Sequence, residues 1–300
     1  MYTILGATGN IGSVITRKLL EKGEKVRVVG RNAAKLLPYV QRGAEAFVAD
    51  IKDADSLTKA LTGVRAGFLM MPPRMTSPDY AAEQEVETSA ISSAAKNAGL
   101  PYAVNLSSYG AQASAGTGPI LGQHISEKKL NAVERLNVLH LRPAYFMENH
   151  LSGIDMIKMM GIFGGPLNPD LKIPMIATRD IGFYAADRLL KLDFNGKQTQ
   201  ELLGERELSM TEVVAVIGKA IAQKDLRYVQ FAYDQVEHAL IQMGVPAKTA
   251  AYFIEMFEGI NTGVVRGAEP RSASNTTPTP IETFVKETFA PAYLGKAVTA

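Results

Sequence analysis

The sequence contains no cysteine among its 300 residues. Without cysteine there is no disulfide framework, no thiolate nucleophile and no cysteine-based metal site. No apolar run approaches the ~20 residues that a membrane-spanning helix needs. No excess of one charge exists either, because 32 basic residues stand beside 30 acidic ones. We therefore expect neither nucleic acid nor a membrane as a partner.

The remaining composition is that of an ordinary globular chain. Hydrophobic residues make up 46% of the sequence and charged residues 21%, which is enough apolar material for a sizeable core. The chain starts with Met1-Tyr2-Thr3 and enters a strand-like segment at once, which leaves no room for a signal peptide. Together with the missing cysteines, this start predicts a cytoplasmic protein.

Strand-like and helical patterns alternate through the first 145 residues. This alternation predicts a parallel sheet covered by helices on both faces, the doubly wound Rossmann fold, and we assign residues 1–150 to such a domain. The expected strands are 2–5, 25–29, 44–49, 66–71, 102–106 and 137–141. We expect a first helix that ends near residue 20 and further helices over 33–41, 56–61 and 80–98. One more helix is expected before the last strand.

The pattern loosens after Pro143. Residues 161–174 contain several Gly and Pro residues and are expected to form a loop, whereas 180–190 predict a clear helix. Short helices are expected over 210–222, 233–243, 247–257 and 281–289. The Ser/Thr/Pro-rich stretch 269–280 predicts either a flexible loop or a loop beside a pocket. We assign 151–300 to a smaller, mostly helical region on the substrate side, with 175–190 packing back on the first domain.

A glycine turn joins the first expected strand to the first helix. Gly6 permits the tight turn, Gly9 lets the backbone approach a pyrophosphate, and Gly12 lets the helix pack closely against the sheet. The free N–H groups at the helix N-terminus attract the same anion. The turn therefore predicts a dinucleotide site, with contacts from Gly6, Thr8, Gly9, Asn10, Ile11 and Gly12.

The end of the second strand decides which nicotinamide cofactor is preferred. NAD-binding proteins place a carboxylate there, which bonds the ribose hydroxyls. This sequence has Arg31 and Asn32 instead, followed by Lys35. A guanidinium can bind a 2′-phosphate with a planar fork of donors, so these residues predict NADP(H) over NAD(H). The alternative is that Arg31 stacks on the adenine or is only solvated.

Asp50 follows the third strand in the segment VADIKD. An aspartate just beyond the carboxyl end of a strand faces the ligand crevice and can accept from the adenine amino group. It can equally cap the helix that follows. Both interpretations are open from the sequence.

Six segments stand in a specific order and spacing: ILGATGNIG, VVGRNAAKL, VADIKD, AAKNAGL, LSSYGA and LRPAYFMEN. Together they resemble the NmrA-like family of atypical short-chain dehydrogenases/reductases, over residues 2–190. The resemblance implies that the glycine turn and Arg31 bind NADP(H). It also implies that Asp50-Ile51 and Met71-Pro72 line the adenine and ribose parts of the site. Some members of the family are reductases of quinones, dyes or related conjugated compounds, whereas others are non-catalytic redox sensors with protein partners.

Short-chain dehydrogenases use a Tyr-x-x-x-Lys pair as acid and base, and the helix before LRP lacks it. Counting back from Arg142 without gaps puts Ile120 at the place of the tyrosine and His124 at that of the lysine. A shift of four residues instead puts His124 and Lys128 at these places. We favour the ungapped alignment, because several quinone reductases of this family look alike there. His124 is either a functional residue or a histidine that caps or packs.

Further site candidates follow the last two expected strands. By resemblance, Ser107 and Ser108 lie on the nicotinamide side, and Tyr145 belongs to the residues around the nicotinamide. Tyr109 either reaches the same cleft as a catalytic residue or packs under a loop. The other histidines, His140, His150 and His238, share no metal-ligand spacing, and we expect no metal site.

These features predict an NADPH-dependent reductase of a quinone or another flat conjugated acceptor. Such an acceptor takes hydride directly and needs only a proton from water or His124. The main alternative is a non-catalytic NADP(H) sensor that acts through a protein partner. An isomerase, or a carbonyl reductase with an unusual acid, is a third interpretation. The sequence leaves the oligomeric state open.

Overall fold

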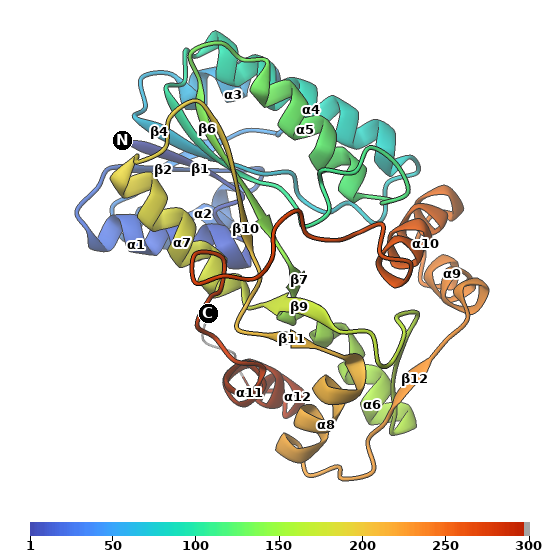
Figure 1. Ribbon diagram of the computed structural model, residues 1–300. Coiled ribbons are helices and arrows are strands. Elements are labelled where there is room, and N and C mark those ends of the chain that lie inside the picture. Colours follow the sequence, from blue (N-terminus) through green and yellow to red (C-terminus); the bar gives the residue numbers. More distant parts are fainter. Residues whose placement is uncertain (297–300) are drawn as a thin grey trace.

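The computed structural model describes residues 1–296 (Figure 1). The last four residues of the expected second region, 297–300, lie outside this described part. The strands are β1 (Tyr2–Leu5), β2 (Val26–Gly30), β3 (Glu45–Val48), β4 (Ala66–Leu69), β5 (Tyr102–Leu106), β6 (Asn137–Pro143), β7 (Tyr145–Phe146), β8 (Phe163–Gly165), β9 (Ile173–Ile176), β10 (Lys197–Leu202), β11 (Glu207–Leu208) and β12 (Tyr228–Gln230). The helices are α1 (Asn10–Glu21), α2 (Ala33–Val40), α3 (Ala54–Leu61), α4 (Tyr80–Asn97), α5 (Ile120–Asn131), α6 (Ile154–Met160), α7 (Thr178–Lys191), α8 (Met210–Ala220), α9 (Tyr233–Gln242), α10 (Ala247–Asn261), α11 (Ile281–Phe284) and α12 (Ala290–Tyr293), with the 3-10 helix η1 (Met147–Gly153) and the π-helix η2 (Val285–Phe289).

A seven-stranded sheet organises the first half of the chain. Its strand order is β10-β6-β5-β4-β1-β2-β3, and every pair is parallel. The order reverses between β1 and β4, which opens a crevice at the carboxyl ends of these strands. The predicted doubly wound Rossmann fold is confirmed.

Each face of the sheet has its own core. The helices α1, α2 and α7 cover one face, and α3, α4 and α5 cover the other (Figure 1). The first core contains Ile15 and Leu19 of α1 with Ile181 of α7, and the second contains Leu57 of α3 with Ile91 of α4. Burial of both faces explains why the central strands are continuous apolar runs in the sequence.

Two elements beyond residue 150 return to this sheet. Strand β10 pairs with β6. Helix α7 packs so closely on α1 that a Cβ on Gly182 would come within 2.6 Å of Val14 Cβ. The expected segment 175–190 thus lies on the first domain. The division at residue 150 stays a proposal, with β10 counted as a strand of the Rossmann sheet and α7 as one of the helices that cover it.

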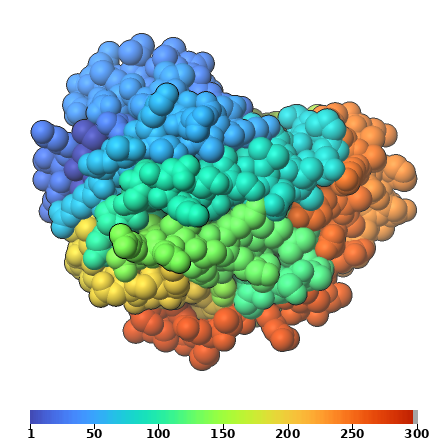
Figure 2. All heavy atoms as spheres, turned by 90° about the horizontal axis from the view of Figure 1, so that it is seen from above, coloured from blue at the N-terminus to red at the C-terminus, as the bar shows by residue number. Residues whose placement is uncertain are grey.

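The rest of the second region forms a separate core. Small sheets of β11-β9-β7 and β12-β8 pack with α8 and the C-terminal helices around Met175, Val213, Ile217 and Phe284. The expected loop 161–174 contains β8 and the first residues of β9, so it is partly strand. The orange helices α9 and α10 abut the cyan atoms around α4 in Figure 2, and α10 contacts α4.

The Ser/Thr/Pro-rich stretch is held in place along its length. Asn275 O accepts from Leu203 N at 2.7 Å, and Glu269 N donates to the buried Glu201 carboxylate at 3.4 Å. At its end the Thr279 hydroxyl donates to Asp180 at 2.7 Å. These hydrogen bonds favour an ordered loop over the flexible-loop interpretation.

Candidate functional site

The glycine turn lies between β1 and α1, at the carboxyl edge of the sheet. Gly6 has φ +65°, and its carbonyl accepts from Gly9 N at 3.0 Å. A Cβ on Gly12 would overlap the Gly6 carbonyl. Thr8, Gly9 and Asn10 are exposed to the crevice side, whereas Ile11 is buried in the core. An Ile11 contact with a cofactor is therefore restricted to its main chain.

The first turn of α1 is suited to an anion. Its N-cap is Gly9, and within the described residues no side chain caps the helix. The first turn contains no acidic residue, so the N–H groups and the helix dipole face no competing carboxylate. This cradle fits a pyrophosphate, because only glycine leaves the space for a close backbone approach.

The side chain of Met70 packs against the glycine turn at Gly6. This contact was not predicted from the sequence. The Met70 Sδ would lie 2.6 Å from a Cβ on Gly6. The thioether thus fills the space that a side chain at Gly6 would need. The adjacent Met71 is buried in the core, and Pro72 is half-buried. Met71 can therefore contact a cofactor only through its main chain.

The end of β2 presents cations to solvent. Arg31 and Lys35 are both exposed, and the first turn of α2 contains no acidic residue. Asn32 is the N-cap of α2, and its side-chain oxygen accepts from Ala34 N at 2.9 Å. The amide nitrogen, and not this oxygen, is the donor of the Asn32 side chain, so Asn32 stays a candidate beside Arg31 and Lys35 for a 2′-phosphate.

Asp50 does not cap the helix that follows it. The cap of α3 is Asp53, which accepts from the main chain of Asp55 and Ser56, so the capping interpretation of Asp50 is wrong. Asp50 instead accepts from Lys52 N at 3.0 Å and keeps 46% of its side chain exposed. The interpretation that remains is a carboxylate facing the crevice, beside the half-buried Ile51.

The turn after β5 contains two serines with different environments. Ser107 is buried and donates to Glu127 on α5. Glu127 also accepts from Arg142 on β6, at 2.9 Å and 2.6 Å. Arg142 and the Ser107 hydroxyl keep the pKa of Glu127 below its ordinary value against the effect of burial. Ser108 is half-buried, so it is the serine with access to the crevice.

Glu127 was missed in the sequence analysis. The available signal was Arg142 itself, a charged residue inside the apolar strand NVLHLRP. A buried guanidinium needs a charged or polar partner, and the neighbouring helix α5 supplies it.

His124 is half-buried on α5. Its Nδ1 lies 2.9 Å from the carbonyl oxygen of Ala111. Because a carbonyl only accepts, Nδ1 carries the hydrogen and Nε2 is the lone-pair nitrogen of the neutral ring. Ile120, one turn earlier, is buried against Ala111 and Val265, whereas Lys128 is exposed. This arrangement favours the alignment that puts Ile120 at the place of the tyrosine.

Tyr109 lies under the ordered stretch that follows α10. Its hydroxyl is hydrogen-bonded to the main chain of Gly267, and burial raises its pKa. A Cβ on Gly267 would come within 2.9 Å of the Tyr109 ring. These contacts favour the packing interpretation of Tyr109 over a catalytic role.

Tyr145 is the first residue of β7, directly after β6. Its hydroxyl bonds the side chain of Asn149, and burial raises its pKa to about 12. Its ring lies 5.6 Å from that of His150, a buried histidine whose two ring nitrogens have no hydrogen-bond partner among the described residues. Tyr145 is thus a neutral phenol, able to donate a hydrogen bond.

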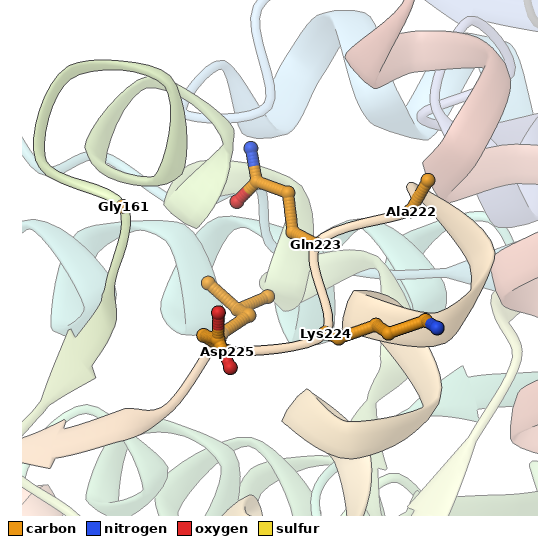
Figure 3. Close-up of a pocket in the computed structure, with 6 residues that line it drawn as sticks. Gly161, Ala222, Gln223, Lys224 and Asp225 are labelled. Carbon is orange, nitrogen blue, oxygen red and sulfur yellow. The ribbon is translucent and has the colours of Figure 1, made fainter.

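A hollow of about 400 Å³ lies away from these residues, beside Gly161 and the loop Ala222–Leu226 (Figure 3). In the close-up, the side chains of Gln223 and Lys224 point in different directions, and Gln223 donates to Tyr293 at 2.8 Å. The hollow includes no residue of the glycine turn or of α5. We therefore place the candidate site at the crevice.

Residues 1–296 contain neither a metal-binding cluster nor a membrane-spanning helix. No group of three or more His, Asp or Glu residues is placed to hold a metal ion in this part of the chain. Over the same residues, no helix is both long and apolar enough to cross a membrane.

Comparisons with known proteins identify the family of the chain. The model of the NmrA-like family matches residues 2–285. The chain is 30% identical to the NAD(P)H azoreductase of Xenophilus azovorans over 259 residues, which are 86% of each chain. It is 26% identical to quinone oxidoreductase 2 of Escherichia coli over 271 residues, 88% of this chain and 89% of that one.

Solved structures show the same fold. The NADPH-dependent quinone oxidoreductase of Escherichia coli, complexed with NADPH, matches with a TM-score of 0.82 at 23% identity, over 96% of this chain and all of that chain. The triphenylmethane reductase of Citrobacter sp., complexed with NADP(H), matches with a TM-score of 0.78 at 18% identity, over 95% and 99% of the two chains.

Proposed function

The chain belongs to the NmrA-like family, and on this premise we propose that it is an NADPH-dependent reductase of quinones or related flat conjugated compounds. The observation that carries the proposal is the glycine turn at the crevice, with an uncapped α1 N-terminus and two exposed cations at the end of β2. The names of the azoreductase and quinone oxidoreductase relatives support the same reaction class.

The cofactor proposal assigns a role to each part of the crevice. Gly6, Gly9 and Gly12 with the α1 N-terminus hold the pyrophosphate. Arg31 and Lys35 bind the 2′-phosphate, because the first turn of α2 contains no carboxylate that would repel it. This arrangement favours NADP(H) over NAD(H). Asp50 accepts from the adenine amino group, with Ile51 and Pro72 beside it.

The chemistry proposal follows from the residues at the nicotinamide end. When bound, NADPH supplies a hydride. With Ile120 at the place of the tyrosine acid, ordinary alcohol–ketone chemistry lacks its proton donor. A conjugated acceptor needs only a proton on an oxygen or nitrogen, and His124 Nε2 delivers it when the ring is cationic. Ser108 and Tyr145 orient the nicotinamide or the acceptor by hydrogen bonds.

A non-catalytic NADP(H) sensor is the second candidate, and the missing tyrosine acid is the observation that favours it. The reductase proposal includes a small-molecule substrate and a cytoplasmic location, the latter inferred from the absence of cysteine. A sensor instead needs a protein partner and different affinities for NADP⁺ and NADPH.

The experiment that separates the two candidates measures NADPH oxidation by the purified protein with a panel of quinones and azo dyes. A binding titration with NADPH and NADP⁺ runs beside it. Acceptor-dependent NADPH oxidation supports the reductase. Tight binding with different affinities for the two forms, and no turnover on any acceptor, contradicts the reductase and supports the sensor.

A further inference from the structure

Arg74 is the centre of a charged cluster at the edge of the crevice. It follows β4, two residues after Pro72, and only 14% of its side chain is exposed. Its Nε donates to Glu87, which is fully buried on α4, and lies 3.4 Å from Glu83. Glu83 in turn forms an ion pair with Lys52. The cluster therefore ties the end of β4 to α4 and to the turn after β3.

The same guanidinium faces Asp50. Arg74 Nη2 lies 3.9 Å from Asp50 Oδ1. Among the described residues this nitrogen has no hydrogen-bond partner. Asp50 is thus held on two sides, by Lys52 N and by the Arg74 charge. The Asp50 side chain stays 46% exposed. This arrangement limits the carboxylate to a narrow range of positions before any ligand binds.

The loop that carries Arg74 is fixed independently of this side chain. The Tyr80 hydroxyl bonds the main chain of Arg74, and the Tyr80 ring stacks on Phe253 of α10 at 5.9 Å. Thr249 of α10 donates to Ser77 O at 2.6 Å. These anchors hold the main chain of the loop without the Arg74 side chain. Loss of that side chain should still lower stability, because Glu87 stays buried without its partner.

We propose that Arg74 is a positioning residue for the adenine of the cofactor, acting through the carboxylate of Asp50. The inference rests on the proposed function, since it requires that the crevice binds NADPH. A fixed acceptor loses less conformational freedom on binding than a mobile one, so holding Asp50 raises the affinity for an adenine amino group. Arg74 itself does not touch the cofactor.

The test compares NADPH with its analogue that contains hypoxanthine in place of adenine and lacks the amino group. The wild-type protein should bind NADPH about tenfold more tightly than the analogue, the size of one charge-assisted hydrogen bond. Arg74→Met should weaken NADPH by about the same factor and leave the analogue unchanged, so that the preference disappears. Arg74→Lys, which keeps the charge but not the fork, should give an intermediate value and is the variant used if Arg74→Met does not fold.

Arg27→Met is the matched control. Arg27 is as buried as Arg74, with 15% of its side chain exposed, and has one ion pair with Glu45 at 2.9 Å. It lies near the start of β2, at the opposite end of the strand from the crevice. Its loss should leave the preference for NADPH over the analogue unchanged.

Three results would overturn the role of Arg74. They are an unchanged preference in Arg74→Met, an equal loss of affinity for both nucleotides, and a wild-type protein without any preference. In the Asp50→Asn background, Arg74→Met should have no further effect on the preference, and an additive effect counts against coupling. A wild-type protein that binds neither nucleotide contradicts the proposed function itself, so the two failures are distinguishable.

Discussion

Replacing Gly9 with alanine should weaken cofactor binding without harming the fold. Gly9 has φ −87° and ψ 172°, a conformation that alanine adopts freely. A Cβ at this position meets only the Gly6 carbonyl oxygen, at 3.4 Å. We therefore expect the stability of the free protein to change by less than about 1 kcal/mol. The added methyl group is exposed at the surface that a pyrophosphate must approach.

The size of the effect follows from this geometry. A methyl group that prevents close approach should weaken NADPH at least tenfold, or by about 1.4 kcal/mol. At NADPH equal to 100 times the wild-type Kd, the ligand stabilises the wild type by about 2.7 kcal/mol, and a tenfold weaker Kd lowers this to about 1.4 kcal/mol. Thermal unfolding with and without NADPH measures both the intrinsic stability and this difference.

Gly12→Ala is the comparison variant. Its Cβ would overlap the Gly6 carbonyl and lie 2.9 Å from Ala7 Cα, so α1 must move away from the turn. We expect a loss of about 1–3 kcal/mol in stability even without NADPH. If Gly9→Ala binds NADPH as the wild type does, the pyrophosphate does not lie at this turn and the assignment of the site is wrong.

Three further predictions concern groups outside the glycine turn. Burial lowers the pKa of His140 and of His150 from 6.5 to about 4. As the pH falls, the unfolded chain therefore binds protons before the folded protein does. The free energy of unfolding should be constant above pH 6.5 and fall by on the order of 3 kcal/mol per histidine as the pH drops toward 4. Urea unfolding of His150→Phe across this range should show a smaller loss, and an equal loss contradicts the assignment. Glu127→Gln should destabilise the protein by about 3–5 kcal/mol in chemical denaturation, because the guanidinium of Arg142 then lacks the opposite charge of Glu127. The double variant Glu127→Leu with Arg142→Met should lose less stability. An equal loss in the two variants refutes the buried pair. His124→Asn should lower kcat for quinone reduction by about 10²-fold or more while leaving Kd for NADPH unchanged, and an unchanged kcat means that water supplies the proton.

The Rossmann half was predictable because its sequence pattern and its fold agree locally. Strands buried on both faces are continuous apolar runs, and the helices between them begin and end at identifiable residues such as Asp53 and Asp79. The expected bounds therefore differ from the observed ones by a few residues at most. The glycine turn was found for the same reason, since its position between a strand and a helix can be read directly.

The second region was less predictable because its strands are short or polar. Strand β10 has the sequence KQTQEL and lies at the edge of the sheet, with its first three residues exposed. No apolar alternation marks such a strand. The strands β7 and β11 have two residues each, too few for any periodicity. Their positions are set by tertiary packing on the core around Met175 and Val213.

The parts of the candidate site that depend on local sequence could be predicted. The pairs of side chains that lie far apart in the sequence could not. The turn at Gly6 and the cations at Arg31 and Lys35 follow from local sequence. The pairs Glu127–Arg142 and Arg74–Asp50 join residues from different elements, and only the fold brings them together. Asp50 itself was ambiguous until the cap of α3 was seen to be Asp53.

The measurement that tests the account most directly is the rate of quinone-dependent NADPH oxidation, compared with that of NADH, in the wild type and in Arg31→Ala. We predict turnover with NADPH preferred, and a preference reduced about tenfold or more by the substitution, because one charge-assisted contact with the 2′-phosphate is lost. Equal use of NADPH and NADH by both proteins would contradict the role of Arg31. Absence of turnover with every acceptor would contradict the reductase.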